Sequence, residues 1–276
     1  MIGAMAPIGD DRKVTTAIRS FHHGDFDAAG LAAARRGRRV TVCLPARDEA
    51  ATVGPIVTCI STGLTAAGGG VDLVDEVVVV DDGSRDDTAA VAAGAGARVV
   101  PSGAAGGGKG QAMAVGLAET SGDLVVFLDA DVENFSARFV VGLLGPLLTG
   151  EDVALVKGCY ERPLHGRPGE GGRVTELVAR PLLDLLFPEL GGIRQPLAGE
   201  TAAPRAVLEK IELAPGYGVE LGLLVDIAEE LGAERVAQVD LGTRIHRNRS
   251  LAELRDQARD VLQAALRRAP GFTVPR

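Results

Sequence analysis

The chain has 276 residues, which is enough for one full-sized α/β domain. Its formal net charge of -8 argues against a general binder of nucleic acids or membrane surfaces. No apolar run reaches the length needed to cross a membrane, and the first residues lack the apolar core of a signal peptide. We therefore expect a cytoplasmic protein with neither nucleic-acid nor membrane partners.

Strand and helix signals alternate through the first part of the chain, which is typical of a doubly wound α/β fold with a mostly parallel sheet. The valine-rich segment DEVVVVDD indicates a strand that is buried on both faces. The expected elements are, in chain order, a helical N-terminal arm and linker (1–37), a strand (39–46), a helix (48–67), a strand–turn–helix–strand unit (75–100), a glycine-rich loop with a helix (106–122), a strand from residue 125, and a helix (136–148).

The second half of the chain is more helical. Its sequence predicts a strand that leaves the core and an apolar helix interrupted near Pro181. The expected elements are a strand (152–164), a loop (165–172), the interrupted helix (173–187), a loop with a helix (214–232), a strand (234–242), a polar basic loop (243–249) and a C-terminal helix capped by Ser250.

Carboxylates follow three of the expected strands, in LPARDE (44–49), VVDDGS (79–84) and FLDAD (127–131). Ligands of open parallel sheets bind beyond the carboxyl ends of the strands. An acidic rim at this place can hold a divalent cation, which in turn holds a phosphate group. Asp129 and Asp131 are therefore expected to bracket a metal and a nucleotide. The alternative is a turn with an aspartate that caps the next helix.

Two glycine-rich segments resemble phosphate loops but fail the usual tests. GGGKG (106–110) lacks the spacing of a P-loop, and GAGARV (94–99) follows a helix instead of a strand. Lys109 begins a helix and can meet a nucleotide base or phosphate, or it can be a solvated loop lysine. The three cysteines, Cys43, Cys59 and Cys159, lack metal-ligand spacing and are predicted to be buried reduced thiols.

Three segments of the first half, LPARDEAATVGPIV, VVVVDDGSRDDT and GDLVVFLDAD, resemble the nucleotide-binding half of GT-A glycosyltransferases. Three further segments, GGRVTELVARPLLDLLFPELGGIRQPLAGE, APGYGVELGLLVD and HRNRSLAEL, resemble the glucosyl-3-phosphoglycerate synthases of actinobacteria. The resemblance covers roughly residues 39–254. It implies a GT-A fold with an N-terminal arm (1–37), a nucleotide-sugar-binding half (38–150) and an acceptor-binding half of the same domain with a C-terminal helix (151–276).

The resemblance also implies an activity. A retaining enzyme of this family moves glucose from UDP-glucose, favoured here over GDP-glucose, to the 2-hydroxyl of D-3-phosphoglycerate with Mg²⁺ or Mn²⁺, and it often forms a homodimer. Enzymatic alternatives are a mannosyl-3-phosphoglycerate synthase and a polyprenyl-phosphate glycosyltransferase. Non-enzymatic alternatives are a sugar-nucleotide-binding protein without turnover and a Rossmann-like assembly module.

The resemblance assigns roles to individual residues. Asp131 and His246 match metal ligands, although His246 by itself reads as a surface histidine. The other matches are Pro45, Ala46, Arg47, Glu49, Asp82, Lys109 and Asp129 for the nucleoside, Arg244 and Arg249 for the diphosphate, Leu197, Gly199, Tyr217 and Glu220 for the donor sugar, and Gly172, Arg173, Thr175 and Asn248 for the phosphate and carboxylate of the acceptor.

Two catalytic residues are expected, Asp131 through the metal and Glu220. Glu220 is the only candidate nucleophile of the second half, or else a favourable charge at a helix start. The resemblance favours same-face attack, in which the leaving phosphate oxygen takes the acceptor proton. Two departures from the family leave the donor open, since Thr201 replaces an aromatic residue and Arg47 an apolar one.

Overall fold

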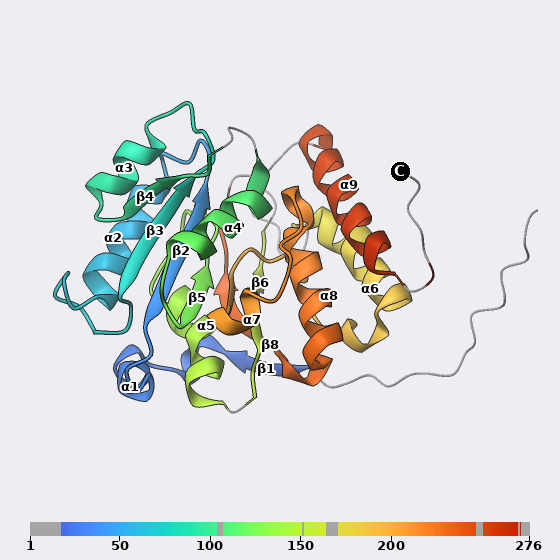
Figure 1. Cartoon of the computed structure of the whole chain (residues 1–276), viewed down its shortest axis with the longest axis horizontal. Coiled ribbons are helices and arrows are strands. Elements are labelled where there is room, and N and C mark those ends of the chain that lie inside the picture. The colour runs from blue at the N-terminus through green and yellow to red at the C-terminus, as the bar shows by residue number, and fades with distance from the viewer. Residues whose placement is uncertain are drawn as a thin grey trace, which may run out of the picture.

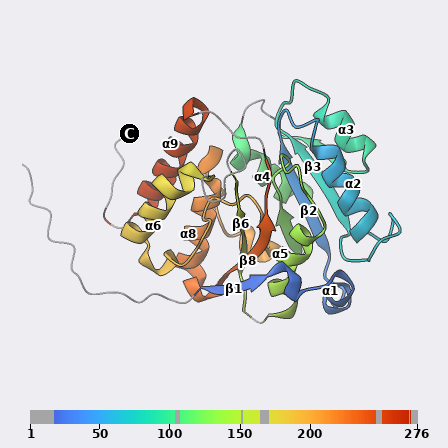
Figure 2. The same ribbon diagram turned by 180° about the vertical axis from the view of Figure 1, so that it is seen from behind.

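The computed structural model describes residues 18–103, 107–150, 152–163, 171–246, 251–269 and 271. Within these residues, one eight-stranded sheet runs through the molecule in the order β1-β8-β6-β7-β5-β2-β3-β4, with helices on both faces (Figure 1, Figure 2). The strands are β1 (Arg19–His22), β2 (Val40–Ala46), β3 (Glu76–Asp81), β4 (Arg98–Pro101), β5 (Leu124–Phe127), β6 (Leu155–Glu161), β7 (Thr201–Pro204) and β8 (Val236–Thr243).

The sheet is mostly parallel, as predicted. Only β7 runs antiparallel, to β5 on one side and to β6 on the other, among the strands that the structure describes. The adjacent strands β5, β2 and β3 are parallel, so their carboxyl ends meet at one edge of the sheet. The three acidic strand ends expected from the sequence therefore lie side by side.

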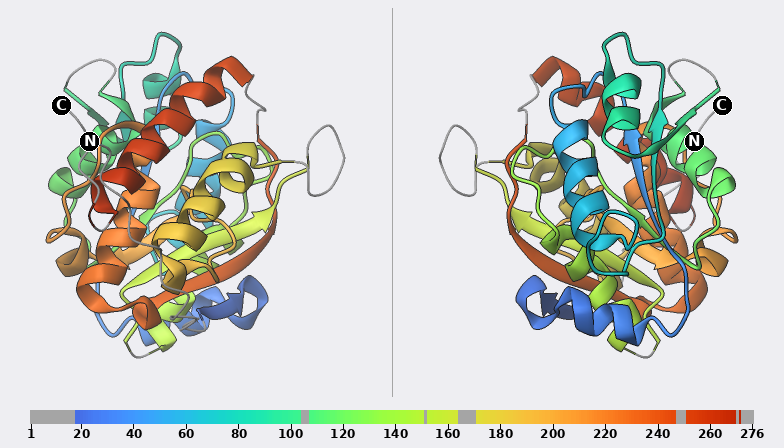
Figure 3. Two further views of the ribbon diagram at one scale, coloured as in Figure 1. Left: turned by 90° about the vertical axis from the view of Figure 1, so that its right-hand side faces the viewer. Right: turned by 90° about the vertical axis from the view of Figure 1, so that its left-hand side faces the viewer.

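The helices form two layers that sandwich the sheet, and Figure 3 shows α6, α8 and α9 packed side by side. One layer contains α1 (Ala28–Ala34), α2 (Val53–Leu64), α3 (Thr88–Gly94) and α5 (Arg138–Thr149). The other contains α4 (Gly108–Glu119), α6 (Arg180–Leu186), α7 (Arg205–Leu208), α8 (Val219–Leu231) and α9 (Leu251–Arg268). Short helical turns are η1 (His23–Asp25), η2 (Thr175–Ala179), η3 (Pro188–Leu190), η4 (Gly216–Gly218) and η5 (Ala233–Arg235).

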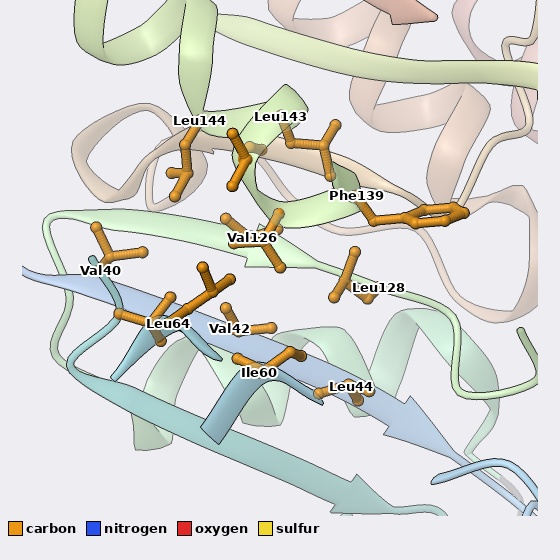
Figure 4. Packing of buried hydrophobic residues seen from close by; sticks show 14 of the residues in the cluster. Val40, Val42, Leu44, Ile60, Leu64, Val126, Leu128, Phe139, Leu143 and Leu144 are labelled. Atoms are coloured by element: carbon orange, nitrogen blue, oxygen red, sulfur yellow. The ribbon is translucent and has the colours of Figure 1, made fainter. Parts of the chain in front are cut away.

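Side chains of the central strands alternate between two cores. Val42 and Leu44 of β2 join the core under α2 and α5, whereas Cys43 between them joins the opposite core. Figure 4 shows Leu64 of α2 and Leu144 of α5 in the first of these cores, with the β2 side chains. Because both faces are covered, every position of these strands favours an apolar residue. This explains why β3 reads as an unbroken run of valines.

Three parts of the secondary structure differ from the expectation. The N-terminal arm is helical at α1, but Arg19–His22 form the edge strand β1, parallel to β8, while residues 1–17 lie outside the described residues. The segment expected to leave the core instead forms β6, which is buried between β7 and β8. The third difference is β7, whose sequence TAAP carries little strand signal because its residues are small and one is proline.

The interruption near Pro181 is confirmed as a π-helical turn, η2, which leads directly into α6. Proline has no N–H to donate, so it disturbs the regular hydrogen bonds of the preceding helical turn. The thiols of Cys43 and Cys159 are buried as predicted, and Cys59 is partly exposed. Burial raises the pKa of Cys43 to about 12 and that of Cys159 to about 11, so both stay protonated. Among the described residues, no helix is long and apolar enough to span a membrane.

The two-core packing predicts a contrast between two identical substitutions. Leu64 is 1% exposed and Leu185 is 75% exposed. We expect Leu64→Ala to lower the free energy of unfolding by about 2–5 kcal/mol, because it leaves a cavity between α2 and the sheet. Leu185→Ala is expected to change it by no more than about 0.5 kcal/mol. Urea unfolding measures both, and equal effects would contradict the packing described here.

Candidate active site

A cavity of about 950 Å³ lies at the carboxyl ends of β2, β3 and β5, and α8, α9 and the segment before α6 close its other side. It brings together residues from both halves of the chain. The predicted site residues that line it are Pro45, Ala46, Arg47, Glu49, Asp82, Lys109, Asp129, Asp131, Gly172, Arg173, Thr175, Leu197, Tyr217, Glu220, Arg244 and His246.

Gly199 also lies at the site, although it is not a lining residue. A side chain at this position would collide with the Asp129 carboxylate and the Lys109 amine. Glycine therefore lets the backbone before β7 approach the charged groups closely. The two remaining candidates, Asn248 and Arg249, lie outside the described residues, as do residues 165–170 of the expected loop and Ser250.

A network of charges forms the floor of the cavity. Asp129 accepts hydrogen bonds from Lys109 and from Nη2 of Arg244, the latter at 2.8 Å. The same Arg244 nitrogen lies 2.6 Å from Oδ1 of Asp131. Lys109 Nζ lies 2.6 Å from Oε1 of Glu220, which is only 6% exposed. Two cations thus link three carboxylates that come from the first and second halves of the chain.

These contacts fix the protonation states of the floor. Burial opposes ionisation of Asp129, but Lys109 and Arg244 outweigh it and hold the pKa of this carboxyl well below its usual range. Burial likewise acts against the charge on Lys109, while Asp129 and Glu220 raise the pKa of the amine above its ordinary value. At neutral pH the aspartate is therefore an anion and the lysine a cation.

Arg244 is held from a second side by residues that the sequence reasoning did not assign. Its Nε lies 2.9 Å from Oε1 of the fully buried Glu200, in a charge contact that lacks hydrogen-bond geometry. The hydroxyl of Tyr160 donates to the other Glu200 oxygen at 2.6 Å, and the Arg244 guanidinium lies 5.3 Å from the centre of the Tyr160 ring. A buried glutamate needs such partners. In the sequence, the only sign that Glu200 is a buried site residue is its place directly before the mostly apolar segment that forms β7.

The loop after β5 is joined to the segment after β8. Val132 and His246 form an antiparallel bridge, and the Glu133 N–H donates to the Ile245 carbonyl at 2.9 Å. The side-chain oxygen of Asn134 accepts from the Ile245 N–H at 2.8 Å. This pairing brings His246 to Asp131, although more than a hundred residues separate them in the sequence.

Asp131 and His246 fit a divalent cation. Burial, with the charges of Arg244 and Arg162, lowers the pKa of His246 to about 4, so its imidazole is neutral and can act as a ligand. The described residues contain no group of three or more His, Cys, Asp or Glu side chains placed for a metal ion. Two protein ligands suit Mg²⁺ or Mn²⁺ when water and substrate phosphates supply the others.

Asp82 lines the cavity directly after β3 and orders the start of α4. Its carboxylate accepts hydrogen bonds from the Ser102 hydroxyl at 2.8 Å and from the Gly108 N–H at 3.1 Å. Arg47 Nη1 lies 3.8 Å from the same carboxylate, but its side chain is 46% exposed. Asp82 therefore positions Lys109, the residue after Gly108, and the Arg47 guanidinium remains reachable from the cavity.

Gly171, Gly172 and Thr175 shape the other corner of the cavity, just before α6. Gly172 has a φ of 73°, a backbone conformation that favours glycine. Its carbonyl accepts from the Glu176 N–H at 3.0 Å, and the Gly171 N–H donates to the Arg162 carbonyl at 3.1 Å. Thr201, by contrast, is 2% exposed, belongs to β7 and does not line the cavity. Thr201, which stands where many relatives have an aromatic residue, is therefore not part of the cavity wall.

The chain is similar in sequence to known glycosyltransferases. The family model "Glycosyl transferase family 2" matches residues 41–165. The chain is 49% identical to a glucosyl-3-phosphoglycerate synthase of Mycolicibacterium paratuberculosis, over 91% of this chain and 79% of that protein. It is 39% identical to one from Petrotoga mobilis, over 91% of this chain and 80% of that protein.

Solved structures of the Mycobacterium tuberculosis glucosyl-3-phosphoglycerate synthase resemble this one at 46% sequence identity. One contains Mn²⁺, UDP-glucose and phosphoglyceric acid; its TM-score is 0.82, and the match covers 93% of this chain and 89% of that one. Another contains Mg²⁺ and UDP; its TM-score is 0.84, and the match covers 93% and 88%. The expected GT-A glycosyltransferase fold is confirmed, and the chain belongs to the glucosyl-3-phosphoglycerate synthase family.

Proposed function

We propose that this protein transfers glucose from UDP-glucose to the 2-hydroxyl of D-3-phosphoglycerate, with Mg²⁺ or Mn²⁺ as its metal and retention of the α configuration. The observation that carries the proposal is that Asp131 and His246, buried cations and the glycines Gly171 and Gly172 all line one cavity. The relatives with solved structures bind UDP-glucose, phosphoglyceric acid and Mn²⁺. A homodimer and a location in the cytoplasm stay predictions.

The donor would lie along the charged floor. The nucleoside would contact Pro45, Ala46 and Glu49 after β2, with Arg47, Asp82, Lys109 and Asp129 as hydrogen-bonding neighbours. Asp131 and His246 would hold the metal, which supplies Lewis-acid stabilisation of the leaving diphosphate when it is bound. Arg244 would add a fixed charge beside it, together with Arg249. The donor glucose would meet Leu197, Gly199, Tyr217 and Glu220.

The acceptor would occupy the corner formed by Gly172, Arg173 and Thr175. Asn248, outside the described residues, stays a predicted acceptor ligand. A hydroxyl, a guanidinium and backbone N–H groups are suitable partners for phosphate and carboxylate oxygens. Arg173 and Thr175 both line the cavity, and Thr175 is 5% exposed. In this proposal the acceptor and the nucleoside bind to different parts of the same cavity wall.

The geometry supports same-face attack over a covalent intermediate. As the glycosidic bond breaks, negative charge grows on the diphosphate and the sugar becomes oxocarbenium-like. Arg244 is already fixed by Glu200 and Tyr160, so it stabilises this charge without reorganising. Glu220 is ion-paired with Lys109, which lowers its nucleophilicity but leaves a carboxylate to bind sugar hydroxyls. The leaving phosphate oxygen then takes the acceptor proton.

The alternatives predict different products. A mannosyl-3-phosphoglycerate synthase would use GDP-mannose, a polyprenyl-phosphate glycosyltransferase would use a lipid acceptor, and a sugar-nucleotide-binding protein or an assembly module would form no product. The chain's identity to glucosyl-3-phosphoglycerate synthases favours glucose and phosphoglycerate over all four.

A product assay tests the proposed function. We expect the protein with Mg²⁺ to convert D-3-phosphoglycerate and UDP-glucose to an α-glucoside, detected by NMR through its anomeric coupling. Parallel reactions with GDP-glucose and GDP-mannose should be slower, and reactions with EDTA should give no product. A β-glucoside, or no product despite metal-dependent UDP binding, would contradict the proposal.

The role of Glu220 can be separated from that of a nucleophile. We expect Glu220→Gln to lower kcat about 10- to 100-fold, the cost of one hydrogen bond to a charged group, and to leave an α product. Loss of a true nucleophile lowers kcat by as much as about 10⁶-fold. Glu212→Gln, at an exposed position, is the control and should keep full activity. A loss on the scale of a nucleophile in Glu220→Gln would favour a covalent intermediate.

A further inference from the structure

We propose that Arg162 is a further substrate-binding residue, which pairs with the carboxylate of the acceptor and so helps to select phosphoglycerate. The inference deepens the proposed function and rests on it. Arg162 lines the cavity, but the sequence assigned it no role in the site. It follows the last residue of β6 directly, at the same edge of the sheet as the acidic strand ends.

Arg162 is built into the acceptor corner. Its carbonyl accepts the Gly171 N–H at 3.1 Å. A Cβ atom on Gly171 would lie 2.6 Å from the Arg162 Cβ, so no side chain other than hydrogen fits there without a shift. One on Gly172 would lie 4.0 Å from the Arg162 Cδ. The glycine pair therefore packs along the arginine side chain, and the proposed acceptor-binding backbone and Arg162 form one surface.

The charge of Arg162 has no carboxylate partner among the described residues. Its guanidinium lies 4.8 Å from the centre of the Tyr160 ring, and Nη2 donates to the Tyr160 hydroxyl at 2.6 Å. Its Nε is buried and has no hydrogen-bond partner. Arg244, on the same tyrosine, contacts three carboxylates. A half-buried guanidinium that is held in place yet lacks a counter-ion is suited to bind an anionic ligand.

The place of Arg162 in the cavity favours the carboxylate of the acceptor, and not its phosphate, as the partner of this arginine. Arg162 shares the Tyr160 ring with Arg244, which contacts Asp131, and it also packs on Gly171 and Gly172. It thus lies between the reacting end of the donor and the acceptor corner. In D-3-phosphoglycerate the reacting hydroxyl is on the carbon that carries the carboxylate, whereas the phosphate is one carbon and one ester oxygen away. The carboxylate is therefore the anion that must approach Arg162.

Calorimetric binding to the Mn²⁺–UDP complex tests this pairing with two ligands, D-3-phosphoglycerate and sn-glycerol 3-phosphate, which lacks the carboxylate. We expect Arg162→Gln to weaken phosphoglycerate binding about 10- to 100-fold and to leave glycerol phosphate binding unchanged. Arg162→Lys keeps the charge and should recover part of the loss. Arg173→Gln should weaken both ligands. Arg180→Gln is the surface control and should change neither, since Arg180 is exposed and pairs only with Glu176 in the described structure.

The outcomes are distinguishable. Equal weakening of both ligands by Arg162→Gln, or weakening of neither, would overturn the carboxylate assignment. A loss of UDP binding in this variant would show a structural role and overturn it as well. Failure of the unaltered protein to bind phosphoglycerate at all, with UDP still bound, would refute the proposed function itself and this inference with it.

Discussion

The active site depends on the buried guanidinium of Arg244. It joins Asp129 and Asp131, which follow β5, to Glu200, which precedes β7, and it lies against the ring of Tyr160 at the end of β6. Arg244 is 2% exposed and Glu200 is fully buried, so neither charge has enough water to stabilise it. Removal of Arg244 would leave the buried Glu200 carboxylate without a counter-charge, which is strongly destabilising. The cavity floor is therefore a rigid unit, with its charges placed before any substrate arrives.

The partners of Arg244 come from both halves of the chain, and one sheet holds the two halves together. The first half supplies the parallel strands whose ends carry Asp82, Asp129 and Asp131. The antiparallel strand β7 then pairs with β5 and β6 and connects the two parts of the sheet. The segment before β7 carries Gly199 and Glu200 to the acidic residues. The helices α8 and α9 line the cavity, and η4, directly before α8, is joined to α9 by a hydrogen bond from the Tyr217 N–H to Asp260 at 3.0 Å.

The first half of the fold was predictable because its signals are local. Valine-rich strands, glycines and carboxylates at strand ends follow directly from a parallel sheet with both faces covered. By contrast, β1 and β7 are four-residue strands that exist through pairing with β8, β5 and β6, and no local pattern reveals such partners. The site residues show the same contrast between local signals and contacts across the chain. Asp129 and Asp131 stand out in the sequence, whereas Tyr160, Arg162 and Glu200 acquire a role only when distant segments meet. His246 was predicted only from the family resemblance. It lies near Asp131 because its backbone forms a bridge with Val132.

In the proposed site, Asp131 and His246 hold a divalent cation whose remaining ligands include the diphosphate of the donor. Mn²⁺ binding followed by electron paramagnetic resonance, with and without UDP, tests it most directly. We expect weak Mn²⁺ binding to the protein alone and much tighter binding with UDP, because a site with two protein ligands is incomplete. In Asp131→Asn the tight, UDP-dependent binding should disappear, whereas Glu133→Gln, an exposed neighbour in the same loop, should bind like the unaltered protein. Equally tight Mn²⁺ binding without UDP, or undiminished binding in Asp131→Asn, would contradict the account.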